Sequence, residues 1–263
     1  PMTARSHTPK RVVLPVLFLV MFFHACSASY KDIGSPTGRK AIMDDAINYL
    51  TDGNCESAIT TLQPLYISRW VDNEVRLLYA SAYACQGGVD FPNLIAAIKD
   101  SPADIWSPLV KANYSDLGDG KAIALLTAAS IIRQTAEIAG SFEASARTED
   151  ANLYMIVVQV QLISTTISGL GQADRTTGNE GIAGWPATSG DMYRCRIQSA
   201  VSTIQDSLEY VESSTNLQTL SNAITTLCVG SCSTNRDPEG CSAADNLEGL
   251  ALMNGISADW TGP

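Results

Sequence analysis

Cysteine is the residue type whose number and spacing in this chain point most directly to chemistry. An even number of cysteines follows Cys26, which is typical of disulfide bonding in an oxidising compartment. These cysteines are Cys55, Cys85, Cys195, Cys228, Cys232 and Cys241. The helix pattern described below favours the pairs Cys55 with Cys85, Cys195 with Cys228, and Cys232 with Cys241. Buried free thiols are the alternative, and zinc is only weakly indicated because the close spacing of a structural zinc site is missing.

Histidine, the usual general base and metal ligand, is confined to the start of the chain. His7 and His24 are the only histidines, and both precede Cys26. A chain processed at that point could not use Ser-His-Asp or Cys-His catalysis, nor a histidine-containing metal site. Asn235, Asp237, Glu239 and Gly240 loosely echo the start of a calcium loop, but Asn246 stands where such a loop has glutamate. The sequence therefore predicts a protein that is not an enzyme and has no metal or cofactor.

The first 25 residues have the pattern of an export signal. A basic start precedes an apolar run from Val12 to Phe23, which is shorter than the ~20 residues that a membrane-spanning helix needs. The basic residues are Arg5, Lys10 and Arg11. We therefore expect residues 1–25 to be a signal peptide and the protein to act outside the cytoplasm.

The residues around Cys26 resemble the bacterial lipobox, in which a small residue precedes a cysteine that becomes the lipidated N-terminus. Ala25 and Cys26 match this pattern, whereas residues 23–24 depart from it. The resemblance implies a lipid anchor on Cys26. With Ser27 in the second position, it also implies a place in the outer membrane. We expect the protein to face the periplasm, and the cell surface is the alternative. An ordinary signal-peptidase cut after Ala28 is the alternative.

The net charge of the chain after Cys26 argues against nucleic-acid binding. It carries all 27 acidic residues and 14 of the 17 basic ones, for a net charge of −13. Such a surface repels phosphate backbones and anionic lipid headgroups. We expect no nucleic-acid partner, and we expect membrane attachment to come from the lipid alone.

The remaining chain has the apolar periodicity of helices. Residues 26–39 are expected to be a tether, and residues 40–263 one all-α domain of about ten helices. Early helices are predicted around Ile42–Leu50 and after the capping residues Asn54 and Asp72. Later ones are predicted over Lys121–Ile138, from Glu149 to about Ile167, over Asp191–Val211 and over Asn216–Cys228. The last two are expected to pair, which would bring Cys195 near Cys228.

One stretch of the long run after Glu149 could be read as a strand. Residues 154–162 are rich in β-branched side chains, which favour strands. The run of about 20 residues without a breaker is too long for an ordinary strand and is typical of a buried helix. We therefore predict a helix there.

Residues 40–100 show two helical hairpins that repeat at a spacing of 34 residues. This shift places Ala46 on Ala80, Tyr49 on Tyr83 and Gly53 on Gly87. The pattern resembles the tetratricopeptide (TPR) family, whose stacked hairpins form a concave binding face. The resemblance implies that Tyr49, Tyr79 and Tyr83, if exposed on that face, are candidates for contacting a partner. Aromatic residues at these repeat positions are more often part of the core, which is the alternative. Any two adjacent amphipathic hairpins can mimic such a repeat.

Residues 101–263 are expected to form longer helices, interrupted by a glycine-rich loop at 169–190. Loops of this length in a compact domain are usually functional or disordered. Trp185 in this loop is a further candidate for partner contact, and packing of Trp185 against the bundle is the alternative.

Three functions fit this architecture. The leading one is a non-catalytic scaffold or protein-binding module in an envelope complex, which could also form homo-oligomers. The lipoprotein signal, hairpins and long helices also resemble the T component of tripartite ATP-independent periplasmic (TRAP) transporters, which implies small-ligand handling. A structural surface protein is the third. An enclosed apolar channel would favour the transport function, and a shallow exposed groove would favour the scaffold. Dense packing with neither feature would favour the structural role.

Overall fold

The computed structural model describes residues 31–90, 106, 109, 120–175, 190–212, 214–227 and 233–258. These residues form α-helices and one short 3-10 turn, and no strand occurs among them. The helices are α2 (Pro36–Thr51), α3 (Cys55–Tyr66), α4 (Asn73–Gln86), α7 (Lys121–Arg133), α8 (Glu149–Arg175), α9 (Gly190–Leu208), α10 (Thr215–Leu227) and α11 (Ala243–Ala258). The 3-10 turn, η1, spans Ala144–Ala146. The predicted all-α fold stapled by disulfides is confirmed.

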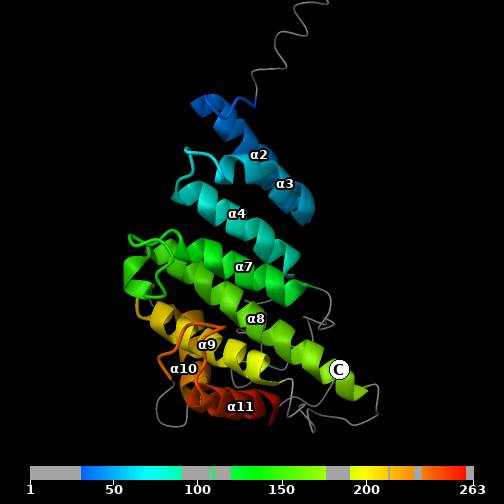
Figure 1. Ribbon diagram of the computed structural model, residues 1–263, viewed down its shortest axis with the longest axis vertical. Coiled ribbons are helices and arrows are strands. Elements are labelled where there is room, and N and C mark those ends of the chain that lie inside the picture. The colour runs from blue at the N-terminus through cyan, green and yellow to red at the C-terminus, as the bar shows by residue number, and fades with distance from the viewer. Residues whose placement is uncertain are drawn as a thin grey trace, which may run out of the picture.

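The helices stack on one another largely in chain order (Figure 1). α2, α3 and α4 form one end, α7 and α8 the middle, and α9 with α11 the other end. Each helix packs mainly on the previous and the next layer. Because the inner helices have neighbours on two sides, one continuous apolar cluster runs from Ala46 in α2 to Ile256 in α11.

The first helix begins earlier than the sequence pattern indicates. Residues 26–39 were expected to be a tether, but α2 already begins at Pro36. The Ser35 hydroxyl caps this helix by accepting a hydrogen bond of 3.0 Å from the Gly38 N–H, and proline suits the first turn. The boundary is therefore set by a Ser-Pro start signal within the supposed tether.

The other early helix boundaries lie where the sequence places them. Gly53 ends α2 in the left-handed region, with φ of 71°. The Asn54 side chain then caps α3 by accepting from the Ser57 N–H at 3.3 Å. The Asp72 carboxylate caps α4 in the same way, accepting from the Val75 N–H at 2.9 Å. The two hairpins expected over residues 40–100 need a fourth helix, but residues 91–100 lie outside the described residues, so the second TPR-like hairpin stays a prediction.

A disulfide joins α3 to α4. Cys55 and Cys85 are bonded, with Cα atoms 5.5 Å apart, as the antiparallel hairpin predicts. Replacing both cysteines with serine should lower the free energy of unfolding by about 4 kcal/mol, because the bond restrains a long loop of the unfolded chain. Urea unfolding of the oxidised protein and the double variant measures this difference. An unchanged midpoint would mean that the reduced hairpin stays ordered in the unfolded chain.

The long helix α8 lies at the centre of the core. Residues 154–162 are helical, which confirms the choice of helix over strand. The stretch Glu149–Gly169 is long and apolar enough to cross a membrane, but 89% of its apolar window is buried within the protein. α7 packs on one side of α8 and α9 on the other, and these neighbours explain its burial. α8 continues to Arg175, so the helix includes the first residues of the loop expected at 169–190.

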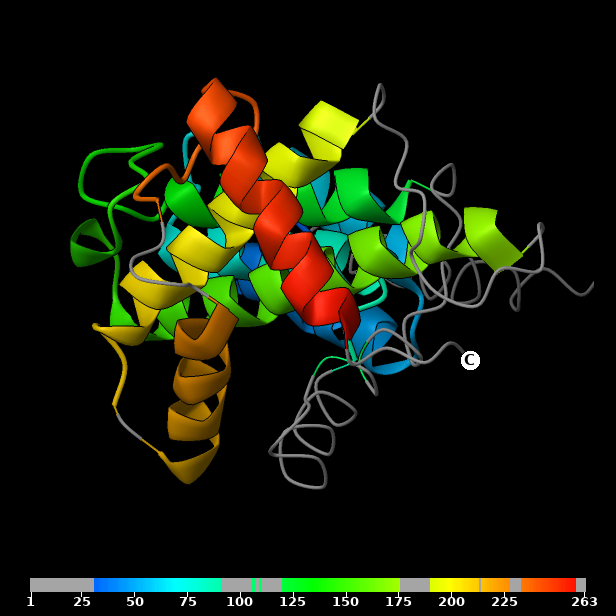
Figure 2. The same cartoon turned by 90° about the horizontal axis from the view of Figure 1, so that it is seen from below.

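The second disulfide differs from the predicted pairings. Cys195 in α9 is bonded to Cys241, with Cα atoms 5.6 Å apart, so the pairs Cys195–Cys228 and Cys232–Cys241 are wrong. Cys228 and Cys232 lie outside the described residues. The prediction assumed that α10 is the main partner of α9, but α11 packs far more extensively on α9. Figure 2 shows α11 lying over α9 while α10 stands out to one side.

Close contact between α9 and α11 explains how Cys241 reaches Cys195. A Cβ atom on Gly249 of α11 would lie 2.3 Å from the Arg194 carbonyl oxygen of α9, so only glycine permits this approach. The segment 233–242, which leads into α11, is thereby held against α9. The Gln198 amide supports it by donating to the Asn235 carbonyl oxygen at 3.2 Å, and the Ser202 hydroxyl donates to the Ser233 carbonyl oxygen.

Candidate functional site

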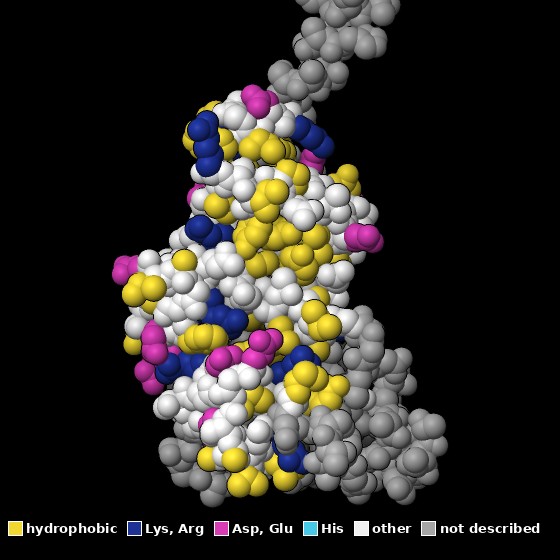
Figure 3. Space-filling model, in the orientation of Figure 1, with side chains coloured by type: hydrophobic (Ala, Val, Ile, Leu, Met, Phe, Trp, Pro, Cys, Tyr) yellow, Lys and Arg dark blue, Asp and Glu magenta, His cyan; other side chains and the backbone are white. Residues whose placement is uncertain are grey.

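Arginines gather around the C-terminal end of α7 although the protein is acidic. The side chains come from α4, α7, the segment 134–148, α9 and the segment 233–242. They are Arg76, Arg133, Arg147, Arg196 and Arg236, five of the 14 basic residues after Cys26. On the face seen in Figure 3, basic and acidic side chains lie together at the level of α7 and α9.

One of these arginines organises the interior of the cluster. Arg147 is 7% exposed, and it donates from Nε to the Asn152 side-chain oxygen at 3.0 Å. It also donates from Nη1 to the Phe142 carbonyl oxygen at 3.3 Å and from Nη2 to the Ser207 hydroxyl at 3.2 Å. Burial lowers the pKa of Arg147 to about 10, partly opposed by the carboxylate of Asp206. Arg147 therefore stays charged at neutral pH and joins segment 134–148 to α8 and α9.

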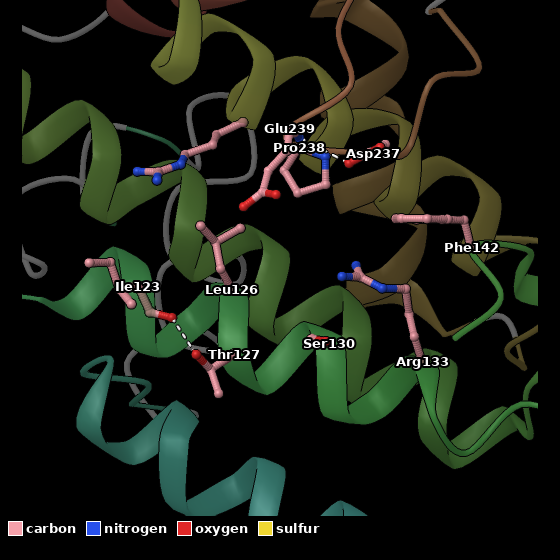
Figure 4. A pocket seen from close by; sticks show the side chains of 10 residues that line it. Ile123, Leu126, Thr127, Ser130, Arg133, Phe142, Asp237, Pro238 and Glu239 are labelled. Atoms are coloured by element: carbon pink, nitrogen blue, oxygen red, sulfur yellow. Dashed lines mark hydrogen bonds between the residues drawn. The ribbon is translucent and has the colours of Figure 1, made fainter. Parts of the chain in front are cut away.

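A surface pocket of about 460 Å³ opens beside this cluster, between α7, α9 and the segment 233–242. We call it the arginine pocket. Its walls are Ile123, Leu126, Thr127, Ser130, Arg133, Phe142, Arg196, Asp237, Pro238 and Glu239. Figure 4 shows Leu126 and Arg133 pointing from α7 toward the segment with Asp237, Pro238 and Glu239, with Phe142 beside Arg133.

No carboxylate of a described residue contacts either guanidinium group of the arginine pocket. Arg133 stacks on the Phe142 ring at 4.5 Å, and Arg196 lies 5.8 Å from the centre of the Tyr193 ring. Within the described part of the chain, neither guanidinium makes a hydrogen bond or ion pair. Burial lowers the pKa of both arginines. Asp237 and then Glu239 oppose this shift for Arg133, and Tyr193 and then Glu239 oppose it for Arg196, and arginine stays protonated. The pocket thus presents two charged donors that are free to bind an anion.

The acidic wall opposite is held in a fixed turn. The Asp237 carboxylate accepts from the Glu239 N–H at 3.0 Å, and the Asp237 N–H donates to the Asn235 side-chain oxygen at 3.0 Å. The Asn235 and Asp237 side chains, which suggested the calcium loop, therefore shape this turn. Glu239 is exposed, and its carboxylate has no hydrogen bond to a described residue. Asp237, whose carboxylate accepts within the turn, and Glu239 are the two acidic residues of the pocket wall that could compete for the arginines.

The candidate contact residues from the sequence do not form this site. Tyr79 is only 4% exposed, so it is a core residue and not a contact on a binding face. It packs against Tyr66 and Tyr83, with ring centres 4.4 and 5.2 Å away, and burial raises its pKa. Tyr83 is half-buried and Tyr49 is exposed, but neither lines the arginine pocket. Cys26 and Trp185 lie outside the described residues.

The sequence contained one signal for the arginine pocket, namely two arginines on helices of an acidic chain, but it did not show that these arginines meet. Arg133 and Arg196 lie on the predicted helices of an otherwise acidic chain, but they are 63 positions apart and nothing local pairs them. Only the packing of α7, α8 and α9 brings them together.

Fold and pocket define a stack of helices stapled by disulfides, with an open, arginine-lined pocket on its surface. In comparisons with known proteins, no family model matches the chain, and no curated protein or solved structure matches it either.

Proposed function

We propose that this protein is an exported, lipid-anchored and non-catalytic protein-binding module of the bacterial outer membrane, working in an envelope complex. The arginine pocket is the observation that carries this proposal. The lipid attached to Cys26 would hold the helical stack at the membrane. The bonds Cys55–Cys85 and Cys195–Cys241 agree with an oxidising compartment.

The shape of the pocket favours a scaffold over a transport component. A protein that carries small apolar ligands needs an enclosed cavity lined mainly by apolar side chains. The arginine pocket is open to solvent and combines charged and apolar walls. This is the shallow kind of site that receives a side chain or a short segment of another protein.

The charges of the pocket indicate the chemistry of the partner. Two guanidinium groups without carboxylate contacts suit a carboxylate, which arginine can bind through paired hydrogen bonds. Ile123, 64% exposed at the rim, and the Phe142 ring provide apolar surface beside them. The partner segment is therefore acidic with an adjacent apolar side chain.

Site-specific photocrosslinking in the source cells tests this proposal. A photoactivatable benzophenone residue in place of Ile123 should crosslink one envelope protein. The same residue in place of Leu247, which is 68% exposed on α11, is the matched control and should not. Arg196→Gln should reduce the crosslink about tenfold, since a charge-assisted hydrogen bond contributes about 1.5 kcal/mol or more. Glu239→Gln should increase it, because it removes the competing carboxylate.

Equal crosslinking from both positions, or a yield unaffected by Arg196→Gln, would reject the pocket as the contact site. Loss of the crosslink in both charge variants would show that Glu239 itself binds the partner. The partner segment would then carry a positive group as well as a negative one.

A further inference from the structure

A second pocket, of about 480 Å³, lies between the N-terminal turn of α4 and the two ends of segment 134–148. We call it the Arg76 pocket. Arg76 comes from α4, Gln134 follows the end of α7, and Arg147 and Thr148 precede α8. Because these positions are far apart in the chain, tertiary packing alone creates this group of polar side chains.

The guanidinium group of Arg76 does not have a hydrogen-bond acceptor for each of its donors. Its Nη1 donates to the Asn73 side-chain oxygen at 2.9 Å, but its Nε is buried without a hydrogen-bond acceptor. A buried donor of a charged group without a partner is costly, and in native structures it usually has an ion or a water as its partner. Arg76 makes no ion pair with a described residue. Arg76, which lines the pocket, therefore has an unmatched donor on its charged group.

Arg147 adds a second positive charge, and no carboxylate of a described residue contacts it directly. All three of its hydrogen-bond partners are neutral: Asn152, the Phe142 carbonyl and Ser207. A guanidinium group has five N–H donors, so some remain beyond these three bonds. Asp206, the carboxylate that most favours its charge, is itself paired with Arg236 at 3.1 Å.

The neutral polar side chains in the wall of the Arg76 pocket also have N–H or O–H donors available. The Gln134 side-chain oxygen accepts from the Tyr66 hydroxyl at 2.8 Å, which leaves the amide NH2 to donate. The Thr148 hydroxyl accepts from the Ala151 N–H at 3.3 Å, so its own proton is available. Among the described residues that line the pocket, Glu137, which is exposed, is the one carboxylate that opposes this character. Donors without acceptors are the surroundings that an oxyanion requires.

We propose that the Arg76 pocket binds an oxyanion, a phosphoryl or carboxylate group of a small ligand, with Arg76, Arg147, Gln134 and Thr148 as its donors. The pocket is larger than one oxyanion, so the ligand carries further atoms beyond the anionic group. This site does not depend on the function proposed for the arginine pocket, because different side chains form it.

Thermal unfolding and calorimetric titration of the full chain with inorganic phosphate and with citrate test the proposal. Sodium chloride at equal ionic strength is the reference. Phosphate or citrate should raise the unfolding temperature above that in chloride, since a ligand that binds only the folded state stabilises it. Binding of phosphate alone identifies a phosphoryl ligand, and binding of citrate alone a carboxylate ligand.

Arg76→Ala should weaken that binding about tenfold or more, as expected for the loss of a charge-assisted donor. Arg69→Ala is the matched control, because Arg69 is exposed and stacks on Trp70 at 4.6 Å, away from the pocket. Glu137→Gln should strengthen binding, which guards against an Arg76 variant that folds poorly. No stabilisation by either anion, or equal losses in the Arg76 and Arg69 variants, would overturn the proposal.

Discussion

Replacing Arg147 with methionine should lower the free energy of unfolding by about 3 kcal/mol. The substitution keeps an unbranched stem but removes the guanidinium group, which leaves Asn152, the Phe142 carbonyl and Ser207 without their donor. Buried acceptors without partners cost free energy, and removal of a desolvated charge recovers only part of it. The net effect is a lower free energy of unfolding, because three separate segments meet at this one guanidinium group.

Urea unfolding followed by far-ultraviolet circular dichroism measures the loss. Arg69→Met is the control and should change stability by less than about 0.5 kcal/mol, since Arg69 is a surface residue. If Arg147→Met were as stable as the parent protein, the apolar side chain would pack as well as the hydrogen-bonded charge. Arg147 would then have been retained for its charge, in keeping with a role in the Arg76 pocket.

Replacing Cys195 and Cys241 with serine should also lower the free energy of unfolding, by about 4 kcal/mol. A second, local effect is expected: faster hydrogen exchange of the backbone amides in segment 233–242. This segment forms one wall of the arginine pocket, and the disulfide ties its end to α9. The double variant should therefore also lose the crosslink from position 123.

The variant without Cys55 and Cys85 is the matched control, because it loses a bond that encloses a similar length of chain elsewhere in the stack. It should be destabilised to a similar extent, but segment 233–242 should keep its protection. Equal protection in both variants would show that other contacts hold this wall. Those contacts are the hydrogen bonds from Gln198 and Ser202 and the pairing of Arg236 with Asp206 at 3.1 Å.

Predictions that rest on neighbouring residues agree best with the structure. The caps at Asn54 and Asp72 and the turn at Gly53 were predictable, because a helix end is governed by a few residues around it. The pair Cys55–Cys85 followed from a hairpin with a short connection, where two helices have little choice but to lie antiparallel. The early start of α2 was missed because Ser35 and Pro36 also suit a tether.

Predictions that needed the path of the chain between distant helices were wrong. Cys195 was paired with Cys228 on the assumption that sequential helices pack together, and the contact of α11 with α9 overrides that assumption. Tyr79 occupies a repeat position that could face inward or outward, and the neighbouring Tyr66 and Tyr83 rings place it in the core.

The amino-acid sequence by itself determined that the chain is helical, where several helices begin and end, and that cysteines can staple it. These properties depend on side chains within a few turns of one another, so composition and spacing are sufficient to specify them. Only the tertiary structure decided that Arg133 meets Arg196, that Arg76 meets Arg147 and that Cys195 meets Cys241. Such groupings depend on which helix faces bury their apolar surface together, and that choice involves the whole stack at once.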